Sequence, residues 1–330
     1  MTTKYVNGML QTAAGTRYKG LIIPGNNIMT DKLKAHIESL KAQGANIVYG
    51  IDGTQMAKTA KAEMMKSRYR LKMIRRSNEK GYHYFIANLT PHDINENVNL
   101  SVDFANAMWF NPMNGERYMA EINNGKVQVN LRSGESMILQ TFNQAEPTVS
   151  DLPVRKNKPY DNKGKLLNNG WYLSFTESTP EINKQYFIDD LKTWESLDEN
   201  TAKLMGTGVY SAKLKLTKKD LAGCNDWIID LGDVRESARV YINDQYIGCA
   251  WAVPYLLPFS NVFKEGINTI RIEVTNLPAN RIAQLDREGK PWRKMNEINV
   301  VDINYQKTTY EQWPLVPSGL NSRVILYRVK

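Results

Sequence analysis

Apolar residues recur at every second position in short runs from Leu71 onward, and this period constrains the fold more than any other feature of the chain. A period of two predicts half-buried strands, and turn sequences such as Asn123-Asn124-Gly125 separate the runs. We expect six strands within 71–145, forming a small antiparallel sandwich, and eight within 171–330, forming a two-sheet jelly roll. The predicted fold class is therefore mainly β.

The expected strands are short and evenly spaced. In the first block they cover 71–74, 82–89, 98–102, 107–110, 126–131 and 136–142. In the second block they cover 171–176, 208–216, 227–231, 237–242, 245–250, 255–258, 269–275 and 322–328.

One β-α-β unit precedes these blocks. Segments 20–25 and 46–50 read as short strands, and Thr30 is a suitable N-cap for a helix over 31–43. The two strands should run parallel, joined by a right-handed crossover. Two strands and one helix are too few for an independent parallel sheet. Either 5–12 completes it, or the chain starts inside a domain whose earlier strands are missing, and we favour the second interpretation.

Prolines punctuate the polar segment 146–170, which we predict to be a linker. The predicted organisation is thus a partial α/β segment over 1–70, the small sandwich over 71–145, this linker, and the jelly roll over 171–330.

The net charge of +9 does not by itself predict a nucleic-acid surface. The excess is concentrated within 1–75, where aromatic residues are not interleaved as a base-stacking platform requires. A solvated basic face, or one facing an acidic neighbour, is the favoured interpretation. No apolar run is long enough to span a membrane. The start, MTTKYVNGML, lacks the features of a signal peptide, which alone predicts a cytoplasmic protein.

The sequence predicts no metal or cofactor site. Cys224 and Cys249 lie in no CxxC or Cys/His cluster, so we expect two free thiols, with a disulfide between them as the alternative. No DxDxDG-like loop supports a structural calcium ion.

The last block carries a recognisable pattern. The run DLGDVRESARVYIN at 230–243 is followed by Gly248, Trp251 and Pro254-Tyr255, and then by EGINTIRIEVTN at 265–276. This pattern resembles the sugar-binding jelly-roll domain of family 2-type glycosidases. The resemblance implies a galactose-binding-like fold for this block.

Further segments extend the match over nearly the whole chain. They are RRS at 75–77 before YFIAN at 84–88, FNPMNGE at 110–116, TNLPANRI at 275–282 and PSGL at 317–320. Together they resemble the C-terminal region of family 106 α-L-rhamnosidases. The stretch from GTRY to PG, at 15–25, is similar to the flavodoxin-like domain that follows the catalytic barrel in such enzymes.

This resemblance implies glycoside hydrolase ancestry and a place in the periplasm or outside the cell. The implied partner is a plant-type or microbial oligosaccharide that contains rhamnose. The catalytic carboxylates of these enzymes lie N-terminal to the region seen here, in a (β/α)₈ barrel that needs roughly 200 to 250 residues of alternating strand and helix. No catalytic residue is therefore carried over, and the missing barrel is the second expected partner.

Aromatic and amide side chains near predicted loops are the candidate carbohydrate-binding residues. Sugars pack their C–H faces on aromatic rings, and their hydroxyls bond to planar polar groups. Each candidate also has a structural interpretation, such as core packing, turn closure or an ion pair. One candidate belongs to a predicted long loop, 283–300, which could instead contact the barrel. The candidates are Trp251, Tyr255, Asn276, Asn280, Arg281 and Trp292.

Two pairs of acidic residues close together in the sequence could be proposed as hydrolytic carboxylates. They are Asp189 with Asp190 and Asp286 with Glu288. Glycoside hydrolysis needs two carboxylates about 5 to 9 Å apart across a substrate. Acid pairs in polar loops are usually only solvated, so the sequence predicts no catalytic site.

Three functions remain open from the sequence. The first is an accessory portion of an α-L-rhamnosidase-like glycoside hydrolase that supports the barrel and shapes one wall of its cleft. The second is a free-standing carbohydrate-binding protein. The third is a structural module without a ligand.

Overall fold

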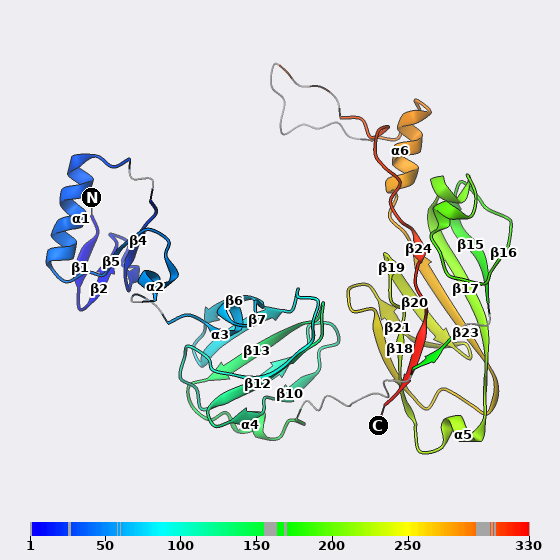
Figure 1. Cartoon of the computed structure of the whole chain (residues 1–330), viewed down its shortest axis with the longest axis horizontal. Coiled ribbons are helices and arrows are strands. Elements are labelled where there is room, and N and C mark those ends of the chain that lie inside the picture. Colours follow the sequence, from blue (N-terminus) through cyan, green and yellow to red (C-terminus); the bar gives the residue numbers. More distant parts are fainter. Residues whose placement is uncertain are drawn as a thin grey trace. The chain divides into compact units, whose positions relative to one another are not determined.

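The computed structural model describes residues 2–25, 28–57, 59, 61–154, 164–167, 170–294, 304, 306 and 308–329. The chain divides into two compact units, unit 1 (Met1–Arg155) and unit 2 (Lys156–Lys330). Antiparallel strands dominate both units (Figure 1), so the prediction of a mainly β fold is confirmed. Each unit is described by itself below.

The first part of unit 1 contains the expected β-α-β unit. Strands β4 (Leu21–Ile23) and β5 (Ile47–Tyr49) pair in parallel, and helix α1 (Asp31–Ala42) connects them. The Thr30 hydroxyl accepts a hydrogen bond from the Leu33 N–H at 3.3 Å and caps this helix. A short helix, α2 (Gly53–Met56), follows β5.

The interpretation in which 5–12 completes this sheet is wrong. Within the described residues, β1 (Lys4–Val6), β2 (Met9–Gln11) and β3 (Arg17–Tyr18) form a separate antiparallel sheet. Asn7 and Gly8 both have positive φ, 50° and 77°, and they turn β1 back onto β2 as a hairpin. The segment therefore pairs with itself rather than with β4 or β5.

The rest of unit 1 is a two-sheet sandwich. One sheet has the order β10-β9-β13-β7-β6 and the other β11-β12-β8. Burial alternates along β12 and β13, so every second side chain enters the core between the sheets. The elements are α3 (Met64–Ser67), β6 (Lys72–Ser77), β7 (Gly81–Ala87), β8 (Ile94–Val98), β9 (Asn106–Phe110), β10 (Arg117–Met119), β11 (Ile122–Asn123), β12 (Lys126–Leu131), β13 (Ser136–Phe142) and α4 (Pro147–Ser150).

The strand expected over 98–102 is placed earlier in the structure, as β8. Val98, Leu100 and Val102 alternate in sequence and all reach the core, but only Val98 pairs with β12. The two later residues reach the core from an irregular segment rather than from a strand. The alternation of apolar residues therefore predicts correctly that these side chains are buried. It does not predict correctly which of them pair in a strand.

A nearly buried carboxylate holds α3 against the sheets of unit 1. The Glu63 side chain, only 10% exposed, accepts hydrogen bonds from Arg75 Nη1 at 2.6 Å and from the Ser101 N–H at 3.0 Å. The Tyr84 hydroxyl also donates to it, at 3.2 Å. Glu63 therefore joins α3, β6, β7 and the segment after β8.

Unit 2 is also a two-sheet sandwich. A six-stranded sheet, in the order β16-β15-β17-β23-β20-β21, packs through a large apolar core against a four-stranded sheet, β14-β25-β18-β22. The elements are β14 (Lys165–Leu166), β15 (Trp171–Thr179), β16 (Tyr186–Ile188), η1 (Trp194–Ser196), η2 (Thr201–Lys203), β17 (Met205–Leu216), α5 (Lys218–Leu221), β18 (Asp226–Asp230), β19 (Val234–Arg235), β20 (Ser237–Ile242), β21 (Gln245–Ala250), β22 (Leu256–Ser260), β23 (Gly266–Thr275), α6 (Ala279–Arg287), β24 (Gly319–Leu320) and β25 (Ile325–Arg328).

Two segments that we expected to be a linker and a loop contain regular secondary structure. The expected linker, 146–170, contains α4 and also β14, which pairs with β25 of unit 2. The part of it over 155–163 and 168–169 lies outside the described residues. The expected loop over 283–300 begins as helix α6, which continues to Arg287, while 295–300 lies outside the described residues.

The core of unit 2 contains one buried polar junction. Trp194 Nε1 donates to the Tyr210 hydroxyl at 2.6 Å, and the Leu320 N–H donates to the same oxygen at 3.0 Å. Gly319 lies against this junction with φ of +98°, and a Cβ there would lie 2.5 Å from Trp194 Nε1. The junction therefore joins η1, β17 and β24 inside the apolar core.

Candidate functional site

Two of the predicted site residues tie together the end of unit 2 that carries α6. The Asn276 amide donates to the Leu204 carbonyl at 3.1 Å and accepts from the Gly206 N–H at 3.0 Å. Asn280 is buried, and its amide donates to the Val316 carbonyl and accepts from the Val316 N–H, at 2.9 and 2.8 Å. Both side chains therefore fix the backbone here, and their contact with a sugar stays a prediction.

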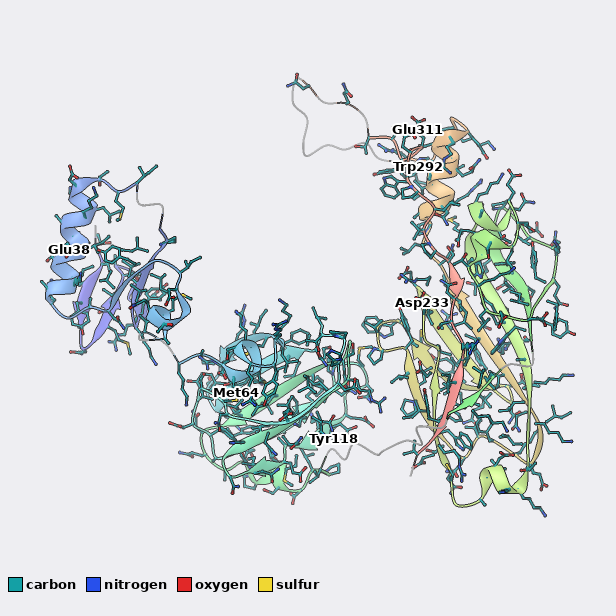
Figure 2. All side chains as sticks on the ribbon, viewed as in Figure 1. Glu38, Met64, Tyr118, Asp233, Trp292 and Glu311 are labelled. Atoms are coloured by element: carbon teal, nitrogen blue, oxygen red, sulfur yellow. The ribbon has the colours of Figure 1, made fainter. Side chains whose placement is uncertain are left out.

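Trp292 belongs to an aromatic cluster beside α6 (Figure 2). Its Nε1 donates to the Asp286 carboxylate at 2.7 Å, and its ring lies 5.9 Å from that of Tyr310. Tyr310 in turn contacts Trp313, with ring centroids 4.3 Å apart. Arg287 donates to the Trp313 carbonyl at 2.8 Å, so α6 holds the cluster from both ends.

The other predicted residues lie on α6 and on the connection from β21 to β22. Arg281 is half-buried in α6. Trp251, 59% exposed, follows β21, and Tyr255 precedes β22. Burial, reinforced by the charge of Glu236, raises the pKa of the Tyr255 hydroxyl. The structure thus brings Asn276, Asn280 and Trp292 to the α6 end, and places Trp251 and Tyr255 elsewhere along the chain.

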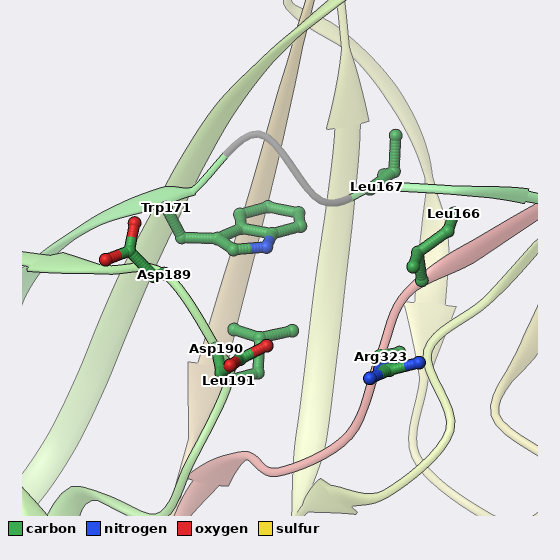
Figure 3. A pocket seen from close by; sticks show the side chains of 7 residues that line it. All are labelled: Leu166, Leu167, Trp171, Asp189, Asp190, Leu191 and Arg323. Carbon is green, nitrogen blue, oxygen red and sulfur yellow. The ribbon is translucent and has the colours of Figure 1, made fainter.

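Neither of the two acid pairs considered in the sequence has the environment of a hydrolytic pair. Asp189 and Asp190 line a small pocket of about 210 Å³ with Arg323, but both carboxylates are exposed and point in different directions (Figure 3). In the second pair, the Asp286 carboxylate accepts a hydrogen bond from Trp292 Nε1. A hydrogen bond from Lys290 lowers the pKa of Glu288 to about 2, whereas a catalytic acid needs a raised pKa.

A row of side chains across the outer face of the six-stranded sheet is the feature that sequence patterns did not reveal. Successive strand pairings place one outward residue from each strand directly beside the next. We name this set the transverse row. In order from β16 to β21 it consists of Phe187, Tyr172, Ser211, Arg271, Tyr241 and Tyr246.

The two ends of the transverse row are aromatic pairs, which we name the rims. In the first rim, the rings of Tyr172 and Phe187 lie 5.2 Å apart, and the side chains are 53% and 57% exposed. In the second rim, the rings of Tyr241 and Tyr246 lie 5.4 Å apart, and Tyr246 is 54% exposed. Each rim thus places two neighbouring aromatic side chains together on the outer face of the sheet.

Close packing fixes the position of each rim. The Phe187 ring lies against Gly170, where a Cβ would come within 2.5 Å of it. The guanidinium carbon of Arg271 lies 3.8 Å from the centre of the Tyr241 ring, and Arg271 also forms an ion pair with Glu273. The rims are therefore held in place by their neighbours in the sheet.

A polar floor separates the rims. Ser211 and Arg271 form it within the row, and the next outward pair along the same strands is Lys213 with Thr269. Together with Tyr172, Phe187 and Tyr241 of the rims, these residues line a groove of about 550 Å³, which is within the range of ligand pockets. Hydroxyl, ammonium and guanidinium groups on such a floor can donate hydrogen bonds to an oxygen-rich ligand.

A carboxylate anchors the strand that carries Phe187. Asp198 accepts hydrogen bonds from the Tyr186 hydroxyl at 2.6 Å and from the Thr201 N–H at 3.0 Å. The hydrogen bond from Tyr186, together with those from the backbone N–H groups of Thr201 and Asn200, holds the pKa of Asp198 below its usual range. Because the folded pKa is lowered, this stabilisation is present above the unfolded pKa and is lost as pH falls through the folded value.

We therefore expect acid to weaken unit 2 through Asp198. As pH falls below about 4, the ordinary pKa of an aspartate, the wild-type unfolding free energy should fall more steeply than that of an Asp198→Asn variant. Urea unfolding followed by tryptophan fluorescence at several pH values measures both slopes. Equal slopes would show that Asp198 contributes nothing to the acid sensitivity.

The described residues contain no group of three or more His, Cys, Asp or Glu side chains placed to hold a metal ion. Cys224 and Cys249 are free thiols. Of the helices in the described part of the chain, none is both long and apolar enough to cross a membrane.

Comparison with known proteins relates this fold to enzymes that act on sugars. No family model matches the sequence. A putative β-glucuronidase of Formosa agariphila is 29% identical over 158 residues, which are 45% of this chain and 14% of that protein. The structure is similar to a rhamnosidase from Novosphingobium sp. PP1Y, with a TM-score of 0.62 and 19% identity. A β-glucuronidase from Ruminococcus gnavus matches less well, with a TM-score of 0.36.

The match to the rhamnosidase covers 99% of this chain but only 35% of the rhamnosidase chain. The chain therefore spans about a third of that enzyme, and a smaller share of the curated relative. Together these comparisons show that the chain has a fold related to that of glycoside hydrolases.

Proposed function

We propose that this chain is the non-catalytic accessory part of an α-L-rhamnosidase-like glycoside hydrolase, which supports a catalytic barrel and binds carbohydrate. The observation that carries the proposal is the match of nearly the whole chain to about a third of a rhamnosidase. The galactose-binding-like character of unit 2 and a place in the periplasm or outside the cell are part of the same proposal.

The end of unit 2 that carries α6 is suited to contact with another protein part. Leu277, Trp313 and Leu315 are exposed apolar residues at this end. Arg287 holds the backbone here by donating to the carbonyls of Glu311 and Trp313, at 2.7 and 2.8 Å. An exposed apolar surface on an ordered backbone is typical of a contact site.

A free-standing carbohydrate-binding protein is the second candidate. The groove between the rims favours it, because such a groove can act without a catalytic partner. In both candidates the expected ligand is a plant-type or microbial oligosaccharide, with rhamnose-containing chains tested first.

Hydrolysis and association assays test the accessory role. We expect the full chain alone to release no nitrophenol from an aryl α-L-rhamnoside. We expect it to co-elute in gel filtration with the separately produced catalytic part of a rhamnosidase from the same genome. A Trp313→Ala/Leu315→Ala variant should lose this association, whereas Phe85→Ala, an exposed site in unit 1, should keep it.

Two outcomes would contradict the proposal. Release of nitrophenol by the chain alone would show that it is catalytic. Co-elution that is equally strong in the Trp313→Ala/Leu315→Ala variant would remove the role of the α6 end. Carbohydrate binding without any association would favour the free-standing candidate.

A further inference from the structure

We propose that the groove on the outer face of the six-stranded sheet binds an oligosaccharide of at least two sugar units, held between the two rims. This inference rests on the carbohydrate-binding half of the proposed function, and it names the site. It differs from the sequence-based candidates, because Trp251, Asn280 and Trp292 are not among the residues that line this groove.

The rims supply the stacking surfaces that a sugar requires. A pyranose ring presents one face of C–H groups, which packs on a flat aromatic ring. Tyr172 and Phe187 in the first rim each expose more than half of the side chain, and Tyr241 of the second rim lines the groove beside Arg271, which covers one face of its ring. The groove therefore offers aromatic surface on both sides of one polar floor.

The floor supplies hydrogen-bond donors for the sugar hydroxyls. Ser211 and Thr269 contribute hydroxyl groups, and Lys213 contributes an ammonium group. Arg271 is already stacked on Tyr241 and paired with Glu273, so its guanidinium group is fixed before a ligand arrives. A fixed polar group costs less conformational entropy on binding than a free one.

The spacing of the rims sets the length of the ligand. Tyr172 and Tyr241 lie on strands separated by three pairing steps, from β15 through β17 and β23 to β20. Neighbouring strands are roughly 4.8 Å apart, so the two rims are about 14 Å apart along the row. One sugar ring can contact one rim at a time, whereas a chain of several units can contact both.

Calorimetry on the full chain tests this inference. The ligands are rhamnose-containing oligosaccharides, neutral and uronate-bearing, from one to five units long. We expect affinity to rise with length until both rims are occupied. Tyr172→Ala/Phe187→Ala and Tyr241→Ala should each weaken binding by about tenfold or more, since each loses an aromatic contact. Phe85→Ala, in unit 1, should bind like the wild type.

The outcomes separate this inference from the proposed function. Loss of binding in Trp251→Ala, with the rim variants unchanged, would overturn the groove while leaving carbohydrate binding intact. Equal affinity for one and five units would also overturn it. Binding of none of these sugars by the wild type would overturn both the groove and the carbohydrate-binding function. Circular dichroism spectra that match the wild type establish that each variant is folded.

Discussion

Replacing Gly319 with alanine is expected to reduce the unfolding free energy of unit 2 by roughly 2 to 5 kcal/mol. Gly319 has φ of +98°, a conformation that costs any residue with a Cβ about 1 to 2 kcal/mol. The new Cβ would also lie 2.5 Å from Trp194 Nε1 and 2.7 Å from the Tyr210 hydroxyl. Both neighbours are fully buried, so neither can move without disturbing the core.

Gly289 offers a matched control for this substitution. It also has positive φ, +63°, but among the described residues no atom beyond its chain neighbours lies within 4 Å of the Cβ that alanine would add. Gly289→Ala should therefore cost only the backbone penalty, about 1 to 2 kcal/mol. Urea unfolding followed by tryptophan fluorescence reports mainly on unit 2, which contains six of the seven tryptophans. Equal losses in the two variants would show that the Trp194–Tyr210 junction tolerates the extra atom.

The Glu63→Ala substitution is expected to destabilise unit 1 by about 2 to 4 kcal/mol. It leaves the Arg75 guanidinium without its carboxylate partner, and it removes the acceptor of the Ser101 N–H and the Tyr84 hydroxyl. Glu63→Gln should recover part of the loss, because its amide oxygen can still accept from Ser101.

Hydrogen exchange measured by mass spectrometry locates this effect within unit 1. Protection should fall in peptides that cover α3, β6 and β7, while β18 and β23 of unit 2 serve as an internal reference. Glu79→Ala, at an exposed position in the same unit, is the control. If Glu63→Ala and Glu79→Ala exchange alike, the carboxylate is not an anchor of the fold.

The sequence was a good guide wherever one face of a regular element is apolar. Helix α1 was expected over 31–43 and is observed over 31–42, because Ile37 and Leu40 form its buried side. Strands β12 and β13 have the predicted bounds, since alternate side chains enter the core. These elements carry their own burial pattern, so local periodicity is sufficient to find them.

Helix α6 is not predicted from the sequence because it has only nine residues and its buried side includes an amide, Asn280. The buried residues of this helix are Asn280 and Ala283, and Asn280 is held by hydrogen bonds to Val316. Leu277-Pro278 before the helix and Gly289 after it were the available signals. Because so short a helix contains few apolar residues, the sequence pattern predicts a loop over 283–300, which overlaps the second half of α6.

The transverse row could not be predicted from the sequence, for a different reason. Tyr172 and Phe187 are outward positions of β15 and β16, and β16 has only three residues. Their alignment with Arg271 and Tyr241 depends on the register of three further strand pairings. Register is set by the whole sheet rather than by any single segment.

The strand order of unit 2 fixes the distance between the two rims. The rim residues Tyr172 and Tyr241 come from distant parts of the chain. The distance between them is nevertheless a whole number of strand separations. Insertions in the connecting loops can change length without altering that interval. If the groove binds oligosaccharides as proposed, moving an aromatic residue from one strand to the next would change the preferred length of the ligand, while the scaffold stays as it is.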